Sequence, residues 1–323
     1  MIESNVHFPT DINLLWDSGR KCLETIKYII DEGGKSIAGW RKIKSWKKEL
    51  KIKMRKLSKI SSRGGFHKEE MVKKSTKEYL KKANILSQKV KYFFDHCPLE
   101  TESDLVRLIS LEYFLKMLDK HIDLVYRRLI RGEKIPAQEK IFSIFETYTE
   151  WITKGKLRPN VELGKKLLVT TDQYHLIVDY LVVEKQADVD LIIPLVDRLI
   201  AKYRIQSLSA DKGFWKKEIK ELLSVFIPEV VIPKKGKLNA EEKELESSKE
   251  YKELKHRHSA IESNINQLEC NGLDRCPDRG LYGFKRYVGL GVLSYNLHQI
   301  GKYLIMLDKC EENKKKSISK NAA

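Results

Sequence analysis

The chain has 323 residues, of which 41% are hydrophobic and 33% are Asp, Glu, Lys or Arg, so it can bury a core in one large domain or two ordinary ones. Its formal net charge of +17 predicts attraction to polyanions such as nucleic acid. No apolar run is long enough to span a bilayer, residues 1–30 lack a signal-peptide pattern, and the five scattered cysteines argue against a disulfide framework or a zinc site.

The positive charge is concentrated in residues 41–91, which hold 19 Lys or Arg and four Glu, so that the rest of the chain carries only +2. Apolar residues there recur at three- and four-residue steps, which predicts an amphipathic helix with a basic outer face. These residues are Ile43, Trp46, Leu50, Met54 and Leu57. Similar stripes predict helices over 79–93 and 105–131, with Gly132 as a C-cap. Residues 20–131 are therefore predicted to form an all-α unit of long antiparallel helices.

The basic outer face has two open interpretations. Lysines can simply solvate the outside of a bundle, but the almost one-sided charge favours contact with phosphates. A membrane surface fits less well because helix packing uses the apolar stripes. The predicted DNA contacts on the first basic helix are Lys42, Lys44, Lys47, Lys48 and Lys51.

After residue 131, strand and helix patterns alternate. Strands are predicted at 140–145, 167–171, 176–183, 205–210 and 230–233, with turns at 151–156 and 172–175. Helices are predicted at 190–203, 212–223 and 239–269. This order predicts an α/β sheet with helices packed on it, and it places Asp211 at the carboxyl end of a strand, where sheet proteins hold catalytic groups.

Two acidic residues are candidates for metal chemistry. Asp211 follows a predicted strand, and Glu262 lies on a predicted helix whose apolar side is Ile261, Ile265 and Leu268. Mg²⁺ prefers carboxylate oxygens, and a pair of such ions can drive displacement at phosphorus. Their spacing alone supports a plainer interpretation, in which Glu262 is a solvated helix residue and Asp211 is a helix N-cap.

Five blocks of residues, in this order, resemble the DDE transposases of bacterial insertion sequences, which have an RNase H-like catalytic core. The blocks are residues 2–11, 142–156, 210–214, 258–266 with 272–280, and 283–296. The resemblance spans almost the whole chain, interrupted by the basic helical segment. It implies that Asp211 is the second metal-binding Asp and Glu262 the catalytic Glu, with Mg²⁺ as the cofactor and Mn²⁺ as its substitute.

The resemblance also implies a fold and a domain order. The expected fold is an α/β, RNase H-like mixed sheet flanked by helices, with a long all-α basic insertion. The expected segments are a remnant of the first core strand and a helix (1–30), the basic insertion (31–135), the catalytic core (136–307) and a disordered basic tail (308–323).

The chain departs from the family pattern in two ways. The family's first catalytic Asp precedes the position that matches Glu3, so the resemblance implies a chain shortened at its amino end, by an internal start or by gene decay. Around Glu262, the Tyr, Arg and Lys of a common signature are replaced by Lys255, His258 and Glu269, so a subgroup without that signature, of the ISNCY type, fits better. Asp172 could stand in for the missing acid, but a turn Asp is the plainer interpretation.

The resemblance implies a transposase catalytic domain that hydrolyses phosphodiesters and transfers DNA strands. Its partners would be double-stranded element ends and target DNA, with no membrane, in a homodimer or larger complex at the nucleoid in the cytoplasm. With two of three carboxylates, the chain alone is expected to be inactive, so its standing as an enzyme stays open. The alternative is a non-catalytic DNA-binding fragment that competes with an intact transposase. Further contacts with DNA are expected beside the site, although ordinary surface charge fits equally, from Lys154, Lys156, Arg257, Arg275 and Arg279.

Overall fold

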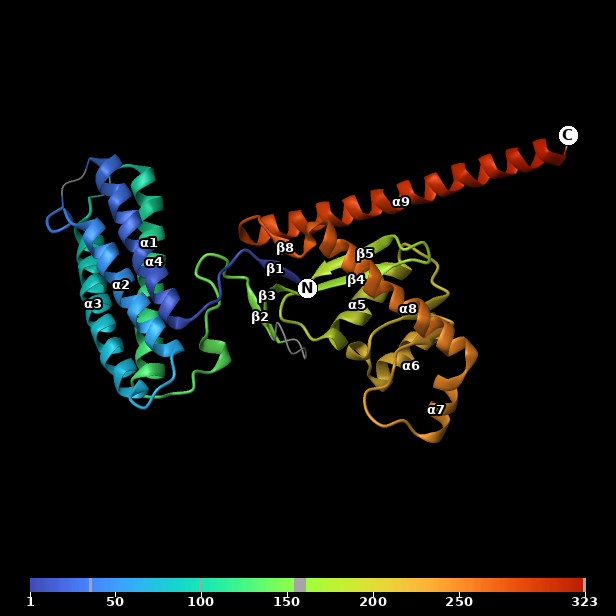
Figure 1. Ribbon diagram of the computed structural model, residues 1–323, viewed down its shortest axis with the longest axis horizontal. Helices are drawn as coiled ribbons and strands as arrows, with labels where there is room; N and C mark the ends of the chain where they lie inside the picture. The colour runs from blue at the N-terminus through green and yellow to red at the C-terminus, as the bar shows by residue number, and fades with distance from the viewer. Residues whose placement is uncertain (35–36, 99, 154–160, 322–323) are drawn as a thin grey trace. The chain divides into compact units, whose positions relative to one another are not determined.

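The computed structural model describes residues 1–34, 37–98, 100–153 and 161–321. They form two compact units (Figure 1). The helical unit is Val6–Thr149, and the sheet unit is Met1–Asn5 together with Glu150–Ala323. Among the described residues, no helix carries an apolar stretch of the length needed to cross a membrane.

The helical unit is a bundle of four long helices (Figure 1). They are α1 (Asp11–Gly33), α2 (Ile43–Ser62), α3 (Lys68–His96) and α4 (Glu102–Leu129). Thr10 caps α1 by accepting a hydrogen bond from the Asn13 backbone N–H, and Thr101 forms a capping box with Asp104 at the start of α4. The predicted helices α2, α3 and α4 are confirmed. The bundle also includes α1, which the sequence places in the 1–30 segment.

Close packing inside the bundle depends on Gly19 of α1. A Cβ atom at this position would lie 2.7 Å from Leu50 Cδ2 of α2 and 3.2 Å from Leu86 Cδ2 of α3. Those two leucines are fully buried, as are Leu23 and Ile26 of α1. The missing side chain therefore lets α1 approach two other helices at once, and any larger residue would have to displace core atoms.

A buried carboxylate in α1 makes the stability of the helical unit depend on pH. Asp17 is 5% exposed, and its Oδ2 lies 3.1 Å from Nε2 of His7. This contact with Asp17 holds the pKa of His7 above the usual range. A raised pKa in the folded state gives a stabilisation that is complete below about pH 6.5 and is lost as the pH rises through the folded pKa.

We therefore expect His7→Gln to lower the Tm most below about pH 6.5, with the difference from the wild type vanishing in alkaline buffer. Thermal unfolding followed by circular dichroism from acid to alkaline pH measures this. A constant difference between the two proteins at every pH would contradict the ion pair between His7 and Asp17.

The sheet unit is mixed α/β, which confirms the predicted class (Figure 1). A four-stranded sheet has the order β2-β3-β1-β8, in which β1 is antiparallel to β3 and parallel to β8. Its strands are β1 (Ile2–Ser4), β2 (Glu150–Thr153), β3 (Val161–Lys165) and β8 (Arg275–Cys276). At Gly164 in β3, a Cβ atom would lie 1.9 Å from the Ile2 carbonyl oxygen, so only glycine permits this pairing.

The remaining strands form two pairs, and the helices follow them along the chain. The hairpin is β4 (Leu167–Thr171) with β5 (Ile177–Val182), and the parallel pair is β6 (Ser207–Ser209) with β7 (Glu229–Val231). The helices are α5 (Asp188–Ile200), α6 (Lys217–Phe226), α7 (Ala240–Ser247), α8 (Lys249–Leu268) and α9 (Gly280–Asn321). Both predicted hairpin strands and the predicted strand before Asp211 are confirmed. The described strands form three small sheets where the sequence predicts one.

Three local predictions were wrong. Residues 140–145 form no strand, because Ser143 Oγ accepts hydrogen bonds from the backbone N–H groups of Phe145 and Glu146 and turns the chain. Trp151 lies in strand β2 instead of a turn, because it pairs with Leu163 in β3. Residues 308–321, predicted to be disordered, continue helix α9, since no Gly or Pro interrupts the chain after Gly301.

Candidate metal-binding site and basic surface

Asp211 lies just beyond the carboxyl end of strand β6. The Ala210 N–H donates to the Val231 carbonyl at 3.0 Å, which continues the parallel pairing of β6 with β7 up to the residue before Asp211. A small apolar core beneath the pair holds it against α5 and α6, and its buried members are Ile192, Val196, Leu223, Ile227 and Ile232. The local fold therefore delivers Asp211 to the edge of a parallel pair, as the sequence predicts.

The Asp211 carboxylate contacts helix α8. It stands at the N-cap of a short 3-10 helix (Lys212–Phe214), but its side chain makes no capping hydrogen bond. Its Oδ1 instead lies 3.0 Å from Nε2 of His258. A carboxylate can only accept, so Nε2 carries the proton, which leaves Nδ1 of a neutral imidazole to accept from Ser209 Oγ at 3.3 Å.

His258 therefore ties α8 to the end of β6. Its side chain is 18% exposed, whereas that of Asp211 is 74% exposed. The hydrogen bond from His258 holds the pKa of Asp211 below its usual range, so the carboxylate is charged in neutral solution. His258 was not among the predicted site residues, although its position four residues before Glu262 was a signal in the sequence.

Glu262 lies on the same face of α8 as His258, one helical turn further along. It is exposed, and the helix is anchored instead by Leu268 and Asn264, which are 3% and 5% exposed. The predicted apolar side is correct at Leu268, but Ile265 is 37% exposed and does not anchor the helix. The structure thus brings the end of β6 to the face of α8 that carries Glu262.

The donor chemistry of these residues fits a hydrated divalent ion. Both carboxylates are open to solvent, and Mg²⁺ retains several waters when few protein oxygens bind it. His258 makes a hydrogen bond to one oxygen of Asp211. In metal sites, hydrogen bonds of this kind from outside the ligand set orient the ligand side chains. Within the described residues, no group of three or more His, Cys, Asp or Glu side chains could hold a metal ion.

Asp172 serves its own hairpin turn. Its Oδ1 accepts hydrogen bonds from the backbone N–H groups of Tyr174 and Leu176, both at 2.9 Å. This Asx-type turn shapes the connection between β4 and β5, where His175 has a positive φ of 63°. The geometry favours the turn interpretation of Asp172 over a role as a third metal ligand.

The contact between His258 and Asp211 can be tested directly. We expect His258→Ala to raise the pKa of Asp211 toward its ordinary value of about 3.9, because the hydrogen bond that stabilises the charged form is lost. A carboxyl ¹³C NMR titration measures this. His258→Gln, whose amide can still donate, should restore part of the shift. An unchanged pKa in His258→Ala would contradict the contact.

The predicted basic contacts of the sheet unit are only partly described. Lys154 and Lys156 lie outside the described residues, and for Arg257 the structure describes the backbone in α8 but not the side chain. Arg275 lies in β8, and Arg279 lies in the turn before α9; both are exposed. Both lie in elements other than those that carry Asp211 and Glu262. Their role as phosphate contacts beside the site stays a prediction.

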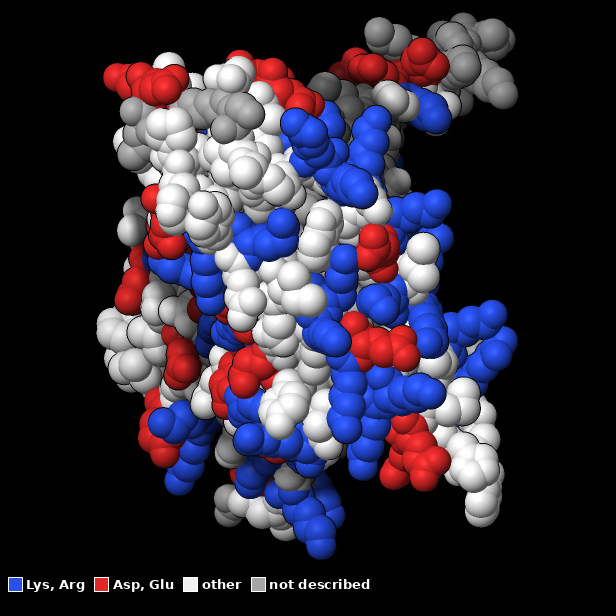
Figure 2. Space-filling view, turned by 90° about the vertical axis from the view of Figure 1, so that its left-hand side faces the viewer, with Lys and Arg blue, Asp and Glu red and all other residues white. Residues whose placement is uncertain are grey.

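Helix α2 presents a row of exposed cations, which we call the basic stripe. The residues recur at three- and four-residue steps, on one side of the helix, and none has an acidic ion-pair partner in the part of the chain that the structure describes. They are Lys44, Lys48, Lys51, Arg55 and Lys59. Arg55 and Lys59 continue the same spacing and were not among the predicted DNA contacts. In Figure 2, Lys and Arg side chains gather in the right-hand half of the face shown.

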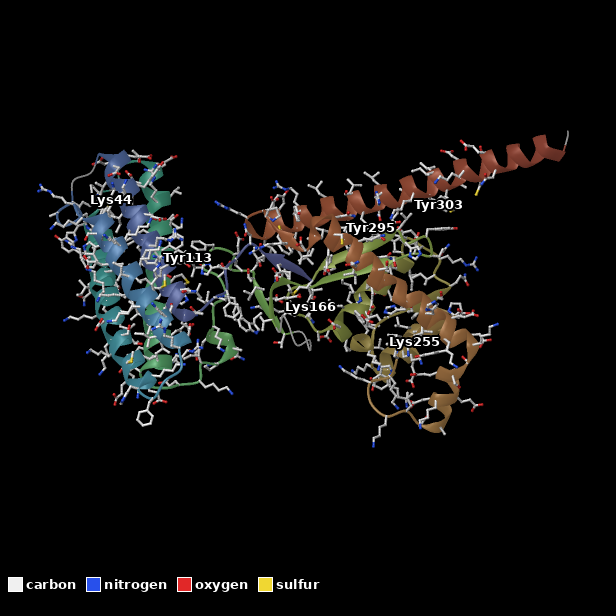
Figure 3. All side chains as sticks on the ribbon, in the orientation of Figure 1. Lys44, Tyr113, Lys166, Lys255, Tyr295 and Tyr303 are labelled. Carbon is white, nitrogen blue, oxygen red and sulfur yellow. The ribbon has the colours of Figure 1, made fainter. Side chains whose placement is uncertain are left out.

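Some other lysines of the bundle are paired with acids. Lys47, a predicted DNA contact, lies 2.6 Å from Glu24, and Lys82 lies 2.6 Å from Glu49. Lys42 precedes α2 and is exposed. The structure therefore separates cations that hold the bundle together from those of the basic stripe, which begins at Lys44 near one end of α2 (Figure 3).

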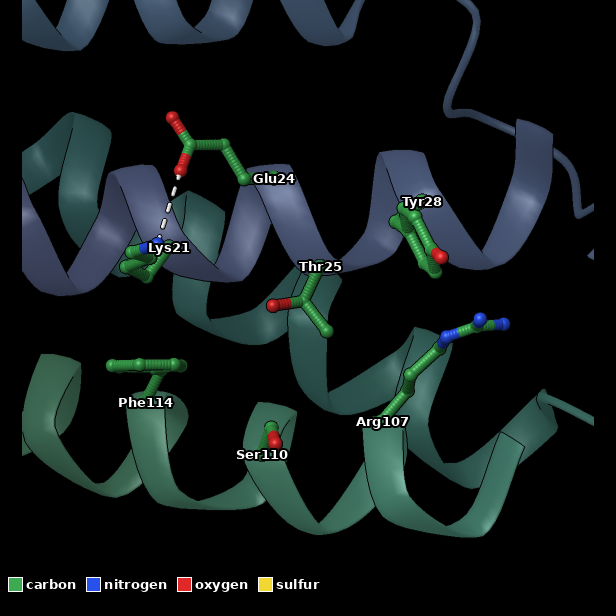
Figure 4. Close-up of a pocket in the computed structure, with 7 residues that line it drawn as sticks. All are labelled: Lys21, Glu24, Thr25, Tyr28, Arg107, Ser110 and Phe114. Carbon is green, nitrogen blue, oxygen red and sulfur yellow. Dashed lines mark ion pairs between the residues drawn. The ribbon is translucent and has the colours of Figure 1, made fainter. Parts of the chain in front are cut away.

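A shallow open pocket of about 320 Å³ lies between α1 and α4 (Figure 4). Lys21 and Glu24 form an ion pair at its wall, and Arg107 stacks on Tyr28 with its guanidinium carbon 4.0 Å from the ring centre. Glu24 is therefore paired with Lys21, and one face of the Arg107 guanidinium is covered by the Tyr28 ring. We assign no chemistry to this pocket.

Comparison with known proteins identifies the family. A family model described as "Transposase DDE domain" matches residues 130–297, which is more than half of the chain. The matched span runs from the end of α4 through the first part of α9 and contains Asp211, His258 and Glu262. No curated protein and no solved structure gave a match. Because the matched domain covers most of the sheet unit and more than half of the whole sequence, the chain belongs to the DDE transposase family.

Proposed function

We propose that residues 136–307 are the RNase H-like catalytic core of an insertion-sequence transposase, in which Asp211 and Glu262 bind Mg²⁺ or Mn²⁺. The observation that carries this proposal is the 3.0 Å hydrogen bond from His258 to Asp211. It joins the end of strand β6 to the face of α8 on which Glu262 lies. A carboxylate at a strand end and another on an adjacent helix are the arrangement that metal-dependent phosphoryl transfer needs.

Each residue has a distinct part in this proposal. Asp211 binds the metal through the oxygen that His258 does not hold, and His258 fixes the orientation of that carboxylate. Glu262 binds from the helix and orients the attacking water or the 3′-hydroxyl. When bound, the divalent ions activate that nucleophile and neutralise charge on the leaving oxygen. The substrate is double-stranded DNA, at the element ends and at the target, which would place the protein at the nucleoid.

The RNase H-like arrangement is supported by the parallel pair β6–β7 and by the order of the sequence blocks, whose last four lie within or overlap the matched span. An ISNCY-type group is supported by the residues around Glu262, which lack the Tyr, Arg and Lys signature. The helical unit is proposed to hold DNA phosphates through the basic stripe, which would position the duplex without reading its sequence.

Because the described residues offer only Asp211 and Glu262 as carboxylates for this metal site, the purified 323-residue chain is expected to give no strand transfer in Mg²⁺. Two cations held by two acids retain more mutual repulsion and are positioned less well. The assay is joining of a labelled element-end oligonucleotide to plasmid DNA. Robust joining by the purified chain would contradict this expectation.

A second function is favoured by the basic stripe itself. A DNA-binding protein without catalysis, which competes with an intact transposase for DNA, needs only those cations. Metal binding separates the two proposals. The catalytic core requires Mn²⁺ binding that falls in Asp211→Asn, whereas the competitor requires only salt-sensitive DNA affinity.

A further inference from the structure

Helix α9 is buried on one side along its first half. Phe284, Val288, Val292 and Tyr295 are at most 5% exposed, and they follow one face of the helix. Tyr295 Oη donates to the His175 carbonyl at 3.1 Å, where α9 passes the hairpin β4–β5 (Figure 3). Further along, Tyr303 makes an edge contact with Tyr174 of the hairpin turn. This side of α9 is therefore committed to the sheet unit.

The opposite side carries six exposed leucine or isoleucine residues, which we call the α9 seam. Their side chains are 44–60% exposed. They are Leu290, Leu293, Leu297, Ile300, Leu304 and Leu307. Their spacing alternates strictly between three and four residues, which is the a/d pattern of a two-stranded coiled coil. The seam extends about 26 Å along the helix, and an apolar row of this regularity is complementary to another row of the same kind.

Two opposite charges continue the same spacing at the ends of the seam. Arg286 precedes Leu290 by four residues, and Glu311 follows Leu307 by four. Both are exposed, and Arg286 also contacts Asp278 at 2.7 Å. In a parallel pair of helices, Arg286 would face Arg286 and Glu311 would face Glu311. In an antiparallel pair, each Arg286 faces the Glu311 of the other helix.

We propose that the α9 seam binds the α9 seam of a second copy of this chain as an antiparallel helix pair. Centring the pair between His298 and Gln299 places Leu290 opposite Leu307, Leu293 opposite Leu304, and Leu297 opposite Ile300. The same register places Arg286 opposite Glu311. The apolar contacts supply the affinity, and the charges at the ends select the antiparallel orientation.

The experiment is sedimentation equilibrium on the full chain without DNA, at about 10 μM, a concentration suited to an interface of ordinary strength. We expect twice the chain mass of 37.7 kDa for the wild type and a single chain mass for Leu297→Lys. Ile305→Lys is the matched control, because Ile305 is 56% exposed on the same helix but lies off the seam. It should remain dimeric. Equal circular dichroism spectra show that the variants are folded.

Charge exchange tests the orientation. Arg286→Glu and Glu311→Arg should each weaken the dimer at least tenfold, and the double variant should recover it. Recovery of the dimer constant separates pairing across the interface from loss of the local contact with Asp278, which the double variant does not restore. A monomeric wild type, a dimer unaffected by Leu297→Lys, an absence of recovery, or a monomer that binds phosphatidylserine vesicles through Leu297 would each overturn the proposal.

Discussion

Replacing Lys44 and Lys48 with Gln should weaken binding of double-stranded DNA by about tenfold to a hundredfold at 0.1 M salt, and should lower the slope of log K against log salt by up to about 1.8. Both cations belong to the basic stripe, and neither is neutralised by an acid within the described residues. Each phosphate contact releases counterions, so each lost contact removes about 0.9 from the slope. Fluorescence anisotropy with a labelled duplex at several salt concentrations measures both quantities.

Lys116→Gln with Lys120→Gln is the matched control for this prediction. These two lysines lie on α4 of the same bundle, are exposed, and have the same four-residue spacing. Their surroundings are acidic, and Lys116 lies 2.6 Å from Glu112. The control pair should change the affinity and the slope far less than the stripe pair. Equal losses for the two pairs would show that only net charge matters and that the basic stripe is not a binding surface.

Asp211→Asn should reduce the affinity for Mn²⁺ by about a hundredfold or more. Loss of a residue that only orients a metal ligand already costs about tenfold to a hundredfold, and Asp211 is proposed to be the ligand itself. The substitution keeps the shape of the side chain and removes the charge that binds the metal. Electron paramagnetic resonance of free Mn²⁺ measures the affinity. Binding of DNA in the absence of metal should be unchanged, because the basic stripe lies in the helical unit.

Asp190→Asn is the control for Asp211→Asn. Asp190 is an exposed acid in the first turn of α5, in the sheet unit but in a different element from β6 and α8. It should leave Mn²⁺ binding unchanged. Similar losses in both variants would mean that Mn²⁺ binds diffusely to surface acids.

The long helices and the position of Asp211 were accessible from the sequence. Stripes such as Leu50 and Leu57 repeat over many turns, so the helical period overrides local ambiguity. Short strands gave weaker signals: Trp151 belongs to β2 only because Leu163, distant in the chain, pairs with it. The turn at Ser143 depends on two hydrogen bonds that alternating apolar residues conceal.

The two acidic residues of the candidate site were predictable from the sequence, but the hydrogen bond that joins their two elements was not. A strand followed by Asp211 and a helix carrying Glu262 are local patterns, but the hydrogen bond from His258 forms only when β6 and α8 meet in the fold. The α9 seam shows the reverse. Its three- and four-residue spacing is visible in the sequence, but the structure was needed to show that the side facing the sheet unit is a different one.

A double-variant cycle of Mn²⁺ affinity for Asp211→Asn and Glu262→Gln tests the central claim most directly. If the two carboxylates hold the same ion, each single variant lowers the affinity strongly, and the double variant loses little more than the worse single one. Glu262→Gln with wild-type affinity, or losses that simply add in free energy, would place the two acids in separate environments and contradict the proposed metal site.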